Sequence, residues 1–323
     1  MKYRRFGRSN WQVSEIGYGM WGLAAWKGTD MDEVLKGLDR AVELGCNFFD
    51  TAWAYGDGKS ELILNALLKK YSNKKIYAAS KIPPKNRQWP SKRGADINDV
   101  FPNKYIEKYV DGSLKNLGLE KIDLMQFHVW EDEWAGIDEW KNIIENISKK
   151  GKVERWGISI NRWEPENGLR TLETGKIDSV QVIYNIFDQS PEDRLFPLCK
   201  KLDIGVIARV PFDEGTLTGH FTKKTTFPKG DWRNIYFNKE NLYESVERAD
   251  ALRPYIPPKM DMPEMALRFI LSNPDVHTTI PGMRQVKHVV ANMATSDGFG
   301  LKYDTLVELR KHRWDRTPTK WSM

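Results

Sequence analysis

Eight short apolar segments recur along the chain and alternate with stretches whose apolar residues repeat every three or four positions. The apolar segments predict β-strands near 16–19, 47–50, 76–80, 123–127, 153–160, 179–183, 205–208 and 276–280. The stretches between them predict amphipathic helices, among them 34–44, 62–67, 105–117, 140–147, 195–202, 262–271 and 286–293. Strands that alternate with helices must return in the same direction, so we expect a parallel sheet.

Eight strand-helix units over 323 residues match the size of a (β/α)8 barrel of the TIM type, with a doubly wound open sheet as the alternative. No linker rich in Pro, Gly or Ser divides the chain, which favours a single domain over residues 1–323. A long loop insertion is expected at about 211–258, where a binding loop or lid is a common use of such length. The tail at about 302–323 either caps the barrel rim or frays.

The composition narrows the class of protein. A hydrophobic fraction of 40% predicts a sizeable core, and the 50 basic and 44 acidic residues are mixed along the chain, which does not predict a nucleic-acid partner. No apolar stretch approaches the ~20 residues of a membrane span, and the first residues do not resemble a secretory signal. The two cysteines predict a reduced, cytoplasmic protein, and the five histidines show no metal-ligand spacing. The oligomeric state stays open.

Three of the predicted strands end on an ionisable residue. Asp50 ends the second strand, Lys81 follows the third, and His128 follows the fourth, while Tyr55 lies five residues past Asp50. Each residue alone would more often be a solvated strand end or a helix cap. Because parallel strands bring their carboxyl ends to one rim, the four together predict a site for proton transfer on a carbonyl.

Two short motifs imitate nucleotide-binding loops without their structural context. Residues 17–22 read G-x-G-x-x-G, but the first convincing helix starts near Thr29 and Asp30, too late for a dinucleotide-binding Rossmann motif. Residues 56–60 resemble the end of a P-loop, but Trp53 stands where the required first glycine would be. We therefore predict neither site.

A series of motifs in a fixed order covers nearly the whole chain. They lie at 6–9, 13–14, 50–56, 81, 117–119, 122–124, 128, 157–159, 181, 184–185, 217–219, 280–284 and 292. By these motifs the chain resembles the aldo-keto reductases, barrel oxidoreductases that use a nicotinamide cofactor without a Rossmann domain. The resemblance implies reduction of an aldehyde or ketone to an alcohol, or the reverse. A nicotinamide-binding regulatory subunit of a membrane channel and a sugar-binding barrel without redox chemistry are the alternatives.

The resemblance also implies roles for the four rim residues. Tyr55 would be the general acid that protonates the substrate oxygen, with Lys81 as a cation that lowers the pKa of the phenol. Asp50 would hold Lys81 in place, and His128 would orient the carbonyl and donate a hydrogen bond to its oxygen.

NADP(H) is the preferred cofactor, with NAD(H) not excluded, because Arg284 and Lys287 would place cations near a 2′-phosphate. The cofactor-binding residues implied by the resemblance are Ser159, Gln181, Arg209, Pro211, Phe212, Gly215, Leu217, Gly282, Arg284, His288 and Asn292. Ile160 departs from the Asn common in the family, and Asn161, one position later, would face the other way. Arg209 stands where many members stack a Tyr on the nicotinamide; an ion pair with an acid at the rim is the alternative for its side chain.

Tryptophans are frequent in the loops expected at the same rim. The substrate-pocket candidates are Trp21, Trp53, Trp89 and Trp130, with Trp26 in the same group. They predict an aromatic, mostly apolar pocket for an aromatic aldehyde, a steroid-like ketone or a sugar. The alternative is that about half of them pack loops against the barrel.

Overall fold

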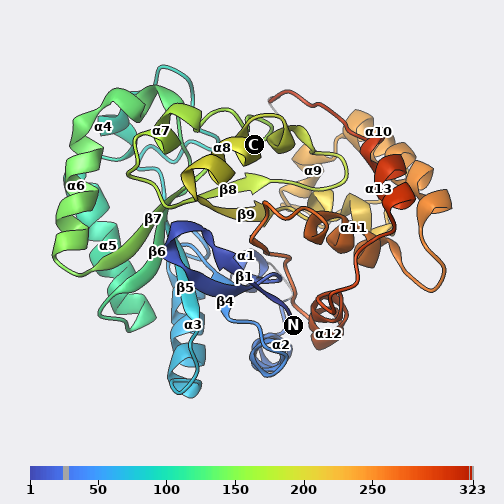
Figure 1. Ribbon diagram of the computed structural model, residues 1–323, viewed down its shortest axis with the longest axis horizontal. Coiled ribbons are helices and arrows are strands. Elements are labelled where there is room, and N and C mark those ends of the chain that lie inside the picture. Colours follow the sequence, from blue (N-terminus) through green and yellow to red (C-terminus); the bar gives the residue numbers. More distant parts are fainter. Residues whose placement is uncertain (25–28, 320, 322–323) are drawn as a thin grey trace.

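The computed structural model describes residues 1–24, 29–319 and 321 and shows eight parallel strands arranged as a barrel (Figure 1). The strands follow one another in chain order: β3 (Tyr18–Gly19), β4 (Phe48–Asp50), β5 (Tyr77–Ile82), β6 (Ile122–Phe127), β7 (Val153–Ser159), β8 (Ser179–Ile183), β9 (Gly205–Arg209) and β10 (Thr278–Thr279). Parallel bridges from Ile16 to Thr279 and from Gly19 to Gly282 join the first strand region to the last. The predicted (β/α)8 barrel is confirmed, and the open sheet is wrong because this seam is paired.

Helices surround the barrel on its outside (Figure 1). They are α1 (Trp21–Ala24), α2 (Met31–Glu43), α3 (Lys59–Lys70), α4 (Ile97–Val100), α5 (Asn103–Leu117), α6 (Asp138–Lys149), α7 (Leu169–Glu173), α8 (Leu195–Leu202), α9 (Arg233–Tyr236), α10 (Lys239–Leu252), α11 (Met262–Leu271), α12 (Val286–Ala294) and α13 (Tyr303–Arg310). The sequence predicts the start of α2 correctly, because Asp30 caps it by accepting hydrogen bonds from the N–H groups of Asp32 and Glu33. None of the helices within the described ranges is long and apolar enough to cross a bilayer.

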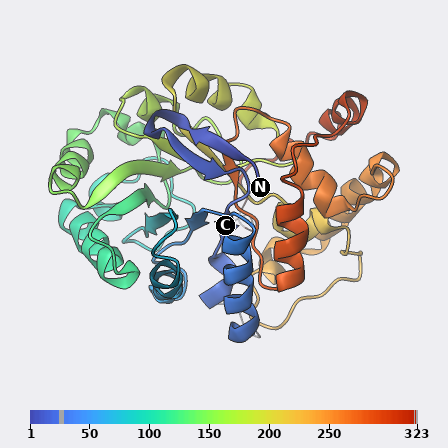
Figure 2. The same cartoon turned by 60° about the horizontal axis from the view of Figure 1, so that its bottom comes forward.

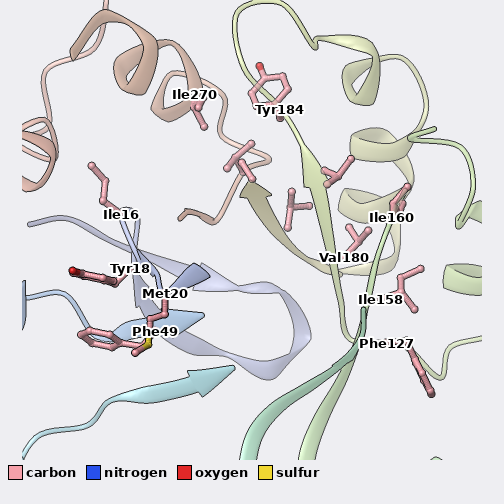
Figure 3. Close-up of a cluster of buried hydrophobic side chains, with 14 of the residues drawn as sticks. Ile16, Tyr18, Met20, Phe49, Phe127, Ile158, Ile160, Val180, Tyr184 and Ile270 are labelled. Carbon is pink, nitrogen blue, oxygen red and sulfur yellow. The ribbon is translucent and has the colours of Figure 1, made fainter. Parts of the chain in front are cut away.

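The main hydrophobic core fills the layer between the strands and the helices (Figure 3). Tyr18, Phe49, Phe127 and Ile158 are fully buried there, each from a different strand. Alternate residues of the same strands point to the barrel interior, as the two-residue period of a strand requires. The barrel therefore has an apolar outer face and an inner face that is free to carry polar side chains.

An antiparallel hairpin of β1 (Tyr3–Phe6) and β2 (Trp11–Ser14), which the sequence analysis did not predict, lies across the barrel (Figure 2). Phe6 and Trp11 join the interior cluster with Phe48 and six other apolar residues. A Cβ on Gly205 would lie 2.6 Å from the ring of Phe6, so this position requires glycine. The hairpin thereby fills the barrel at the amino ends of the strands, opposite the rim where the predicted site lies.

The predicted insertion at 211–258 is largely helical. It holds the 3₁₀ segment Asp213–Thr218, the short α9 and the 14-residue α10, whose buried face includes Leu242 and Val246. The tail after α13 packs against the barrel, since the backbone N–H of Trp314 donates to the carbonyl of Phe187 at 2.8 Å. Of the two alternatives for the tail, the described part caps the fold.

Candidate active site

The predicted site residues share the inner face of the barrel at the carboxyl ends of the strands. Members of the interior apolar cluster stand two positions before four of the polar residues: Phe48 before Asp50, Ala79 before Lys81, Leu124 before Gln126, and Ile207 before Arg209. Ser159 and Gln181 reach the same face because their neighbours Ile158 and Val180 belong to the outer layer. Six adjacent strands thus contribute to one polar layer.

A buried ion pair between Asp50 and Lys81 lies at the centre of this layer. Lys81 Nζ donates to Asp50 Oδ1 and also to the carbonyl oxygen of Thr51 at 2.7 Å. The second carboxylate oxygen accepts from Gln181 Nε2 at 2.9 Å and from Gln126 Nε2 at 3.2 Å. The side chains of both charged residues are at most 2% exposed. Burial lowers the pKa of Lys81, and the Asp50 carboxylate opposes that effect.

Tyr55 and His128 lie beside the ion pair, as the sequence predicts. Lys81 Nζ is 5.1 Å from the centroid of the Tyr55 ring, and the Tyr55 and His128 rings meet edge to face at 5.6 Å between centroids. The Nδ1 atom of His128 is buried and has no hydrogen-bond partner among the described residues. The four residues therefore form one contiguous cluster with an unused imidazole nitrogen.

The electrostatics of Tyr55 differ from the sequence expectation in one respect. Burial and then the Asp50 carboxylate raise the pKa of the phenol, and Arg209 is the cation that opposes this. The phenol is thus protonated at neutral pH. Burial, Lys81 and Arg209 hold the pKa of His128 well below its usual value, so this imidazole is neutral and carries one N–H. The neutral imidazole of His128 can donate a hydrogen bond, and the protonated phenol of Tyr55 can donate a proton. Both suit a substrate oxygen that gains negative charge.

Arg209 is a partly buried cation that has no carboxylate partner in the part of the chain that the structure describes. Its Nη2 donates to the carbonyl oxygen of Ile160 at 3.1 Å, while its buried Nε has no partner among residues 1–24, 29–319 and 321. Burial, followed by Arg162, lowers the pKa of Arg209 to about 10. The alternative of an ion pair at the rim is not seen within those residues.

Two departures from the family pattern are visible in the structure. Ile160 lies in the helix-facing core, and Asn161 is turned toward Glu131, to which its Nδ2 donates at 3.0 Å. Asn161 therefore does not take over the expected amide position. Gln181 donates to Asp50, so it belongs to the ion-pair network in addition to its predicted role toward a cofactor.

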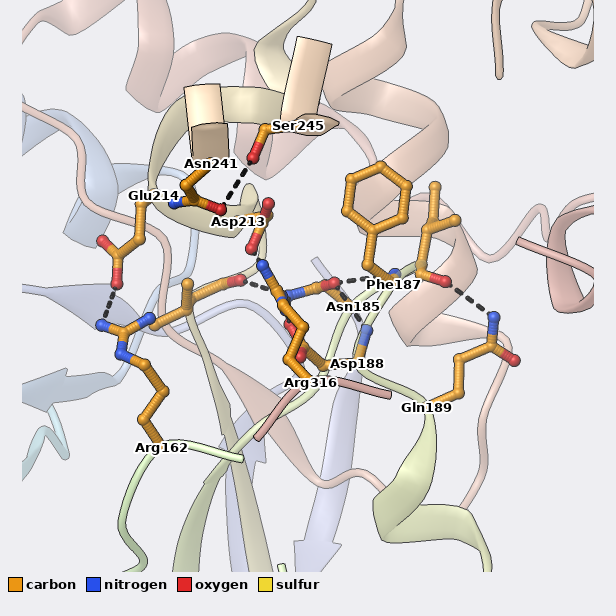
Figure 4. A network of polar contacts seen from close by, with 12 residues as sticks. Arg162, Asn185, Phe187, Asp188, Gln189, Asp213, Glu214, Asn241, Ser245 and Arg316 are labelled. Atoms are coloured by element: carbon orange, nitrogen blue, oxygen red, sulfur yellow. Dashed lines mark hydrogen bonds and ion pairs between the residues drawn. The ribbon is translucent and has the colours of Figure 1, made fainter. Parts of the chain in front are cut away.

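The loop after β9 gathers the predicted cofactor-binding residues Pro211, Phe212, Gly215 and Leu217 into one turn, whose 3₁₀ segment is Asp213–Thr218. Gly215 has a φ of 112°, and a Cβ there would lie 2.8 Å from the ring of Phe221. Glu214 in the same turn forms an ion pair of 2.5 Å with Arg162, a residue that the sequence analysis missed (Figure 4).

A second group of cations lies around the start of α12. Burial lowers the pKa of Arg284, and Arg233 lowers it further. Burial also lowers the pKa of His288, with Lys287, Arg284 and His220 acting in the same direction. Asn292 is buried nearby in the same helix. Arg233 and His220 come from the insertion and were missed, because a strand-and-helix pattern does not show where a long insertion folds back.

The polar groups fit a nicotinamide dinucleotide. A Cβ added at Gly282 would meet no atom within 4 Å, which leaves room beside the backbone before α12. The mutually repelling cations around Arg284 suit an anionic phosphate, and the unpartnered nitrogens of His128 and Arg209 suit a polar ring at the other end. Within the described ranges, no three His, Cys, Asp or Glu side chains gather as a metal site requires.

Two of the four described tryptophans pack against the barrel, as the alternative for these residues expects. Trp130 is fully buried and donates to Thr171 Oγ1 at 2.8 Å, and Trp53 packs on α5 against Tyr109 and Gly112. Trp89 lies edge to face with His128 at 4.4 Å between centroids. The remaining two differ in status: Trp21 contacts the Trp232 ring at 5.2 Å, and Trp26 lies outside the described residues.

Comparisons of the sequence and of the structure with known proteins agree on one family. The model described as "Aldo/keto reductase family" matches residues 15–312. The chain is 29% identical to an aldo-keto reductase of Schizosaccharomyces pombe named for NADP(+), covering 87% of this chain and 83% of that protein. It is 27% identical to the NADH-specific methylglyoxal reductase of Escherichia coli, covering 91% and 93%.

A solved structure and a relative named as a channel subunit extend this comparison. The holo form of an aldo-keto reductase from Bacillus halodurans superposes with a TM-score of 0.77 at 27% identity over the full length of both chains. A probable voltage-gated potassium channel subunit beta of Oryza sativa is 24% identical, covering 92% of each chain.

Proposed function

Because the chain belongs to the aldo/keto reductase family, we propose that it is an NADPH-dependent oxidoreductase that reduces an aldehyde or ketone to an alcohol, or catalyses the reverse. Aldo-keto reductases use nicotinamide cofactors, and an oxidoreductase is what the family implies for this chain. The observation that carries the specific proposal is the buried Asp50–Lys81 pair beside a protonated Tyr55 and a neutral His128.

The residues divide the chemistry between them. A bound reduced nicotinamide supplies the hydride that the carbonyl carbon accepts. Tyr55 gives its phenolic proton to the carbonyl oxygen, so the substrate gains one hydride and one proton and leaves as an alcohol. The single N–H of His128 donates to that oxygen as its negative charge grows. Lys81 and Arg209 then stabilise the phenolate left on Tyr55, while Asp50 keeps Lys81 charged and in place.

The preference for NADPH rests on the cations around α12. Arg284 and Lys287 place positive charge where a 2′-phosphate would add negative charge, the neutral imidazole of His288 offers a hydrogen bond there, and Arg233 adds a cation that is paired with Asp231. The relatives named for NADP(+) and for NADH show that this family supports both choices, so cofactor preference is proposed from these residues alone.

For the substrate, Trp89 supplies a ring edge directly at His128. This contact supports a carbonyl compound with an apolar or aromatic group next to the reacting carbon. A small-molecule carbonyl is therefore the proposed reactant.

Substituting Tyr55 with Phe tests the proposal. Tyr55→Phe removes the proton donor and keeps the ring against His128, so turnover of a carbonyl panel should fall at least ~10²-fold. NADPH affinity, measured by fluorescence titration, should stay within a few-fold of the parent. Tyr109→Phe, which removes a phenol packed against Trp53 away from the cluster, is the matched control and should keep parent activity. Near-parent turnover in Tyr55→Phe would remove Tyr55 from the mechanism.

The channel subunit relative keeps one alternative open, a nicotinamide-binding regulatory subunit of the same fold. This alternative predicts tight binding of NADPH with negligible turnover across the whole carbonyl panel. Turnover that depends on Tyr55 would decide for the enzyme.

A further inference from the structure

The loop that carries four of the predicted cofactor-binding residues has a strained backbone. Val210, Asp213 and Glu214 have φ values of 57°, 45° and 57°, in the left-handed region that side-chain-bearing residues avoid. Val210 is β-branched and therefore especially disfavoured there. Conformations of this kind persist only where the surroundings impose them. The contacts that impose this one are therefore part of how the loop works.

A single side chain from the far end of the sequence makes the central contact (Figure 4). Arg316 Nη2 donates to Asp213 Oδ1 at 2.8 Å and to Asp188 Oδ2 at 2.5 Å. Its side chain is 4% exposed, and its guanidinium also lies 4.6 Å from the ring centroid of Trp163. Arg316 and Asp213 are 103 residues apart in sequence. The C-terminal tail thus contacts the loop after β9, and the guanidinium of Arg316 binds it.

The contact continues to the start of the loop. Asp188 also accepts from Asn185 Nδ2 at 2.9 Å, and the same Nδ2 group donates to the carbonyl oxygen of Val210 at 3.0 Å. The loop is therefore held at Val210 through Asn185 and at Asp213 through Arg316. Two of the three strained positions, Val210 and Asp213, are therefore connected to the Asp188–Arg316 pair.

The charges of the residues in this contact bear on cofactor binding. Asp213 and Glu214 put two carboxylates into the turn that carries predicted cofactor-binding residues, and the proposed cofactor is anionic. Arg162 pairs with Glu214, and Arg316 is shared between Asp213 and Asp188, so each carboxylate of the turn faces a guanidinium. Without Arg316 the buried carboxylates of Asp188 and Asp213 would repel each other and the phosphates.

We propose that Arg316 is a positioning residue through which the C-terminal tail fixes the Asp213–Thr218 turn for cofactor binding and sets how long the cofactor stays bound. This inference rests on the proposed nicotinamide-dependent function. Arg316 itself acts through Asp213 and needs no contact with the cofactor.

Cofactor release is the measurement that distinguishes this role from simple support of the fold. Arg316→Met should speed NADPH release at least ~10-fold in stopped-flow fluorescence and weaken equilibrium binding by a similar factor. Its KM for NADPH should rise more than its kcat changes. Arg313→Met is the matched control: it lies three residues earlier in the same tail, pairs with Asp193 at the surface, and should stay within twofold of the parent.

A second variant covers the case in which Arg316→Met does not fold. Arg316→Met/Asp213→Asn removes both charged ends of the contact, which avoids the unpaired carboxylate on the turn. Faster release in this variant supports the proposal, because the tail no longer binds the turn. Parent-like release in either folded variant overturns it. If the parent protein binds neither NADPH nor NADH, the proposed function itself fails, and that outcome is seen before any Arg316 variant is made.

Discussion

Replacing Arg209 with Met should make the ligand-free protein more stable, although the change removes a partly buried side chain at the active site. Burial and then Arg162 disfavour the charge of Arg209 and lower its pKa to about 10, more than two units below that of an ordinary guanidinium. In the unfolded chain the guanidinium has its ordinary pKa. At pH 7 it is charged in both states, so the free energy needed to keep it charged at a partly buried position destabilises the folded state. At about 1.4 kcal/mol for each unit of pKa, that cost is about 3 kcal/mol.

The substitution also loses a hydrogen bond. The bond from Arg209 to the carbonyl oxygen of Ile160, at 3.1 Å, contributes about 1 kcal/mol. The expected net gain is therefore about 2 kcal/mol, or ~3 °C in Tm for a chain of this length. Urea unfolding and thermal melts at pH 7 without cofactor measure it. NADPH should then stabilise Arg209→Met less than it stabilises the parent, because the unpartnered donor offered to the ligand is gone.

Arg162→Met provides the control with the opposite sign. Burial alone would lower the pKa of Arg162, but the Glu214 carboxylate outweighs it and the pKa is raised. Removing Arg162 leaves Glu214 buried and unpaired, so this variant should lose about 3–5 kcal/mol. If Arg209→Met is instead less stable than the parent, Arg209 has a stabilising partner and the reasoning fails.

Two further substitutions test the cofactor site and the pH dependence of folding. Arg284→Ala should weaken NADPH binding ten- to a hundredfold, about 1.5–3 kcal/mol, and leave NADH nearly unchanged in parallel titrations; equal small losses would assign the phosphate to Lys287 and His288. Burial lowers the pKa of His277 from 6.5 to about 4, and its Nδ1 accepts the N–H of Val206 at 2.9 Å. Between these two pH values His277 binds a proton in the unfolded chain but not in the folded chain. The free energy of unfolding therefore falls by about 3 kcal/mol as the pH drops from 6.5 to about 4. His277→Gln should flatten this part of a urea-unfolding series against pH, and an unchanged slope would contradict the assignment.

The barrel and the cluster around Asp50 could be predicted because their signals are local. A strand that ends on a charge places that charge at the rim, and the two-residue period fixes which face it takes. The same period would have identified Gln126, two positions before His128 on the same face. The helix α10 was not predicted, although Leu242 and Val246 are spaced as on one face of a helix, because charged residues surround them in the sequence.

The remaining parts of the site depend on contacts that no local pattern encodes. In the sequence, Arg316 is one charged residue in a polar tail, and only the folded chain places it against Asp213. Trp130 follows a strand as a rim residue would, yet it turns into the helix layer and is fully buried. The positive φ at Val210 likewise has no sequence signal, because a β-branched residue normally predicts extended backbone.

The paired seam of the barrel has a consequence for synthesis on the ribosome. Ile16 pairs with Thr279, and Arg4 donates to three carbonyl oxygens 267 to 272 residues further along the chain. Contacts of such long sequence separation form late, because the entropy of closing the loop must be overcome first. The edge of β3 that faces β10 therefore stays unpaired until almost the whole chain has left the ribosome. Only two residues long, β3 offers little backbone for a neighbouring nascent chain to pair with during that time.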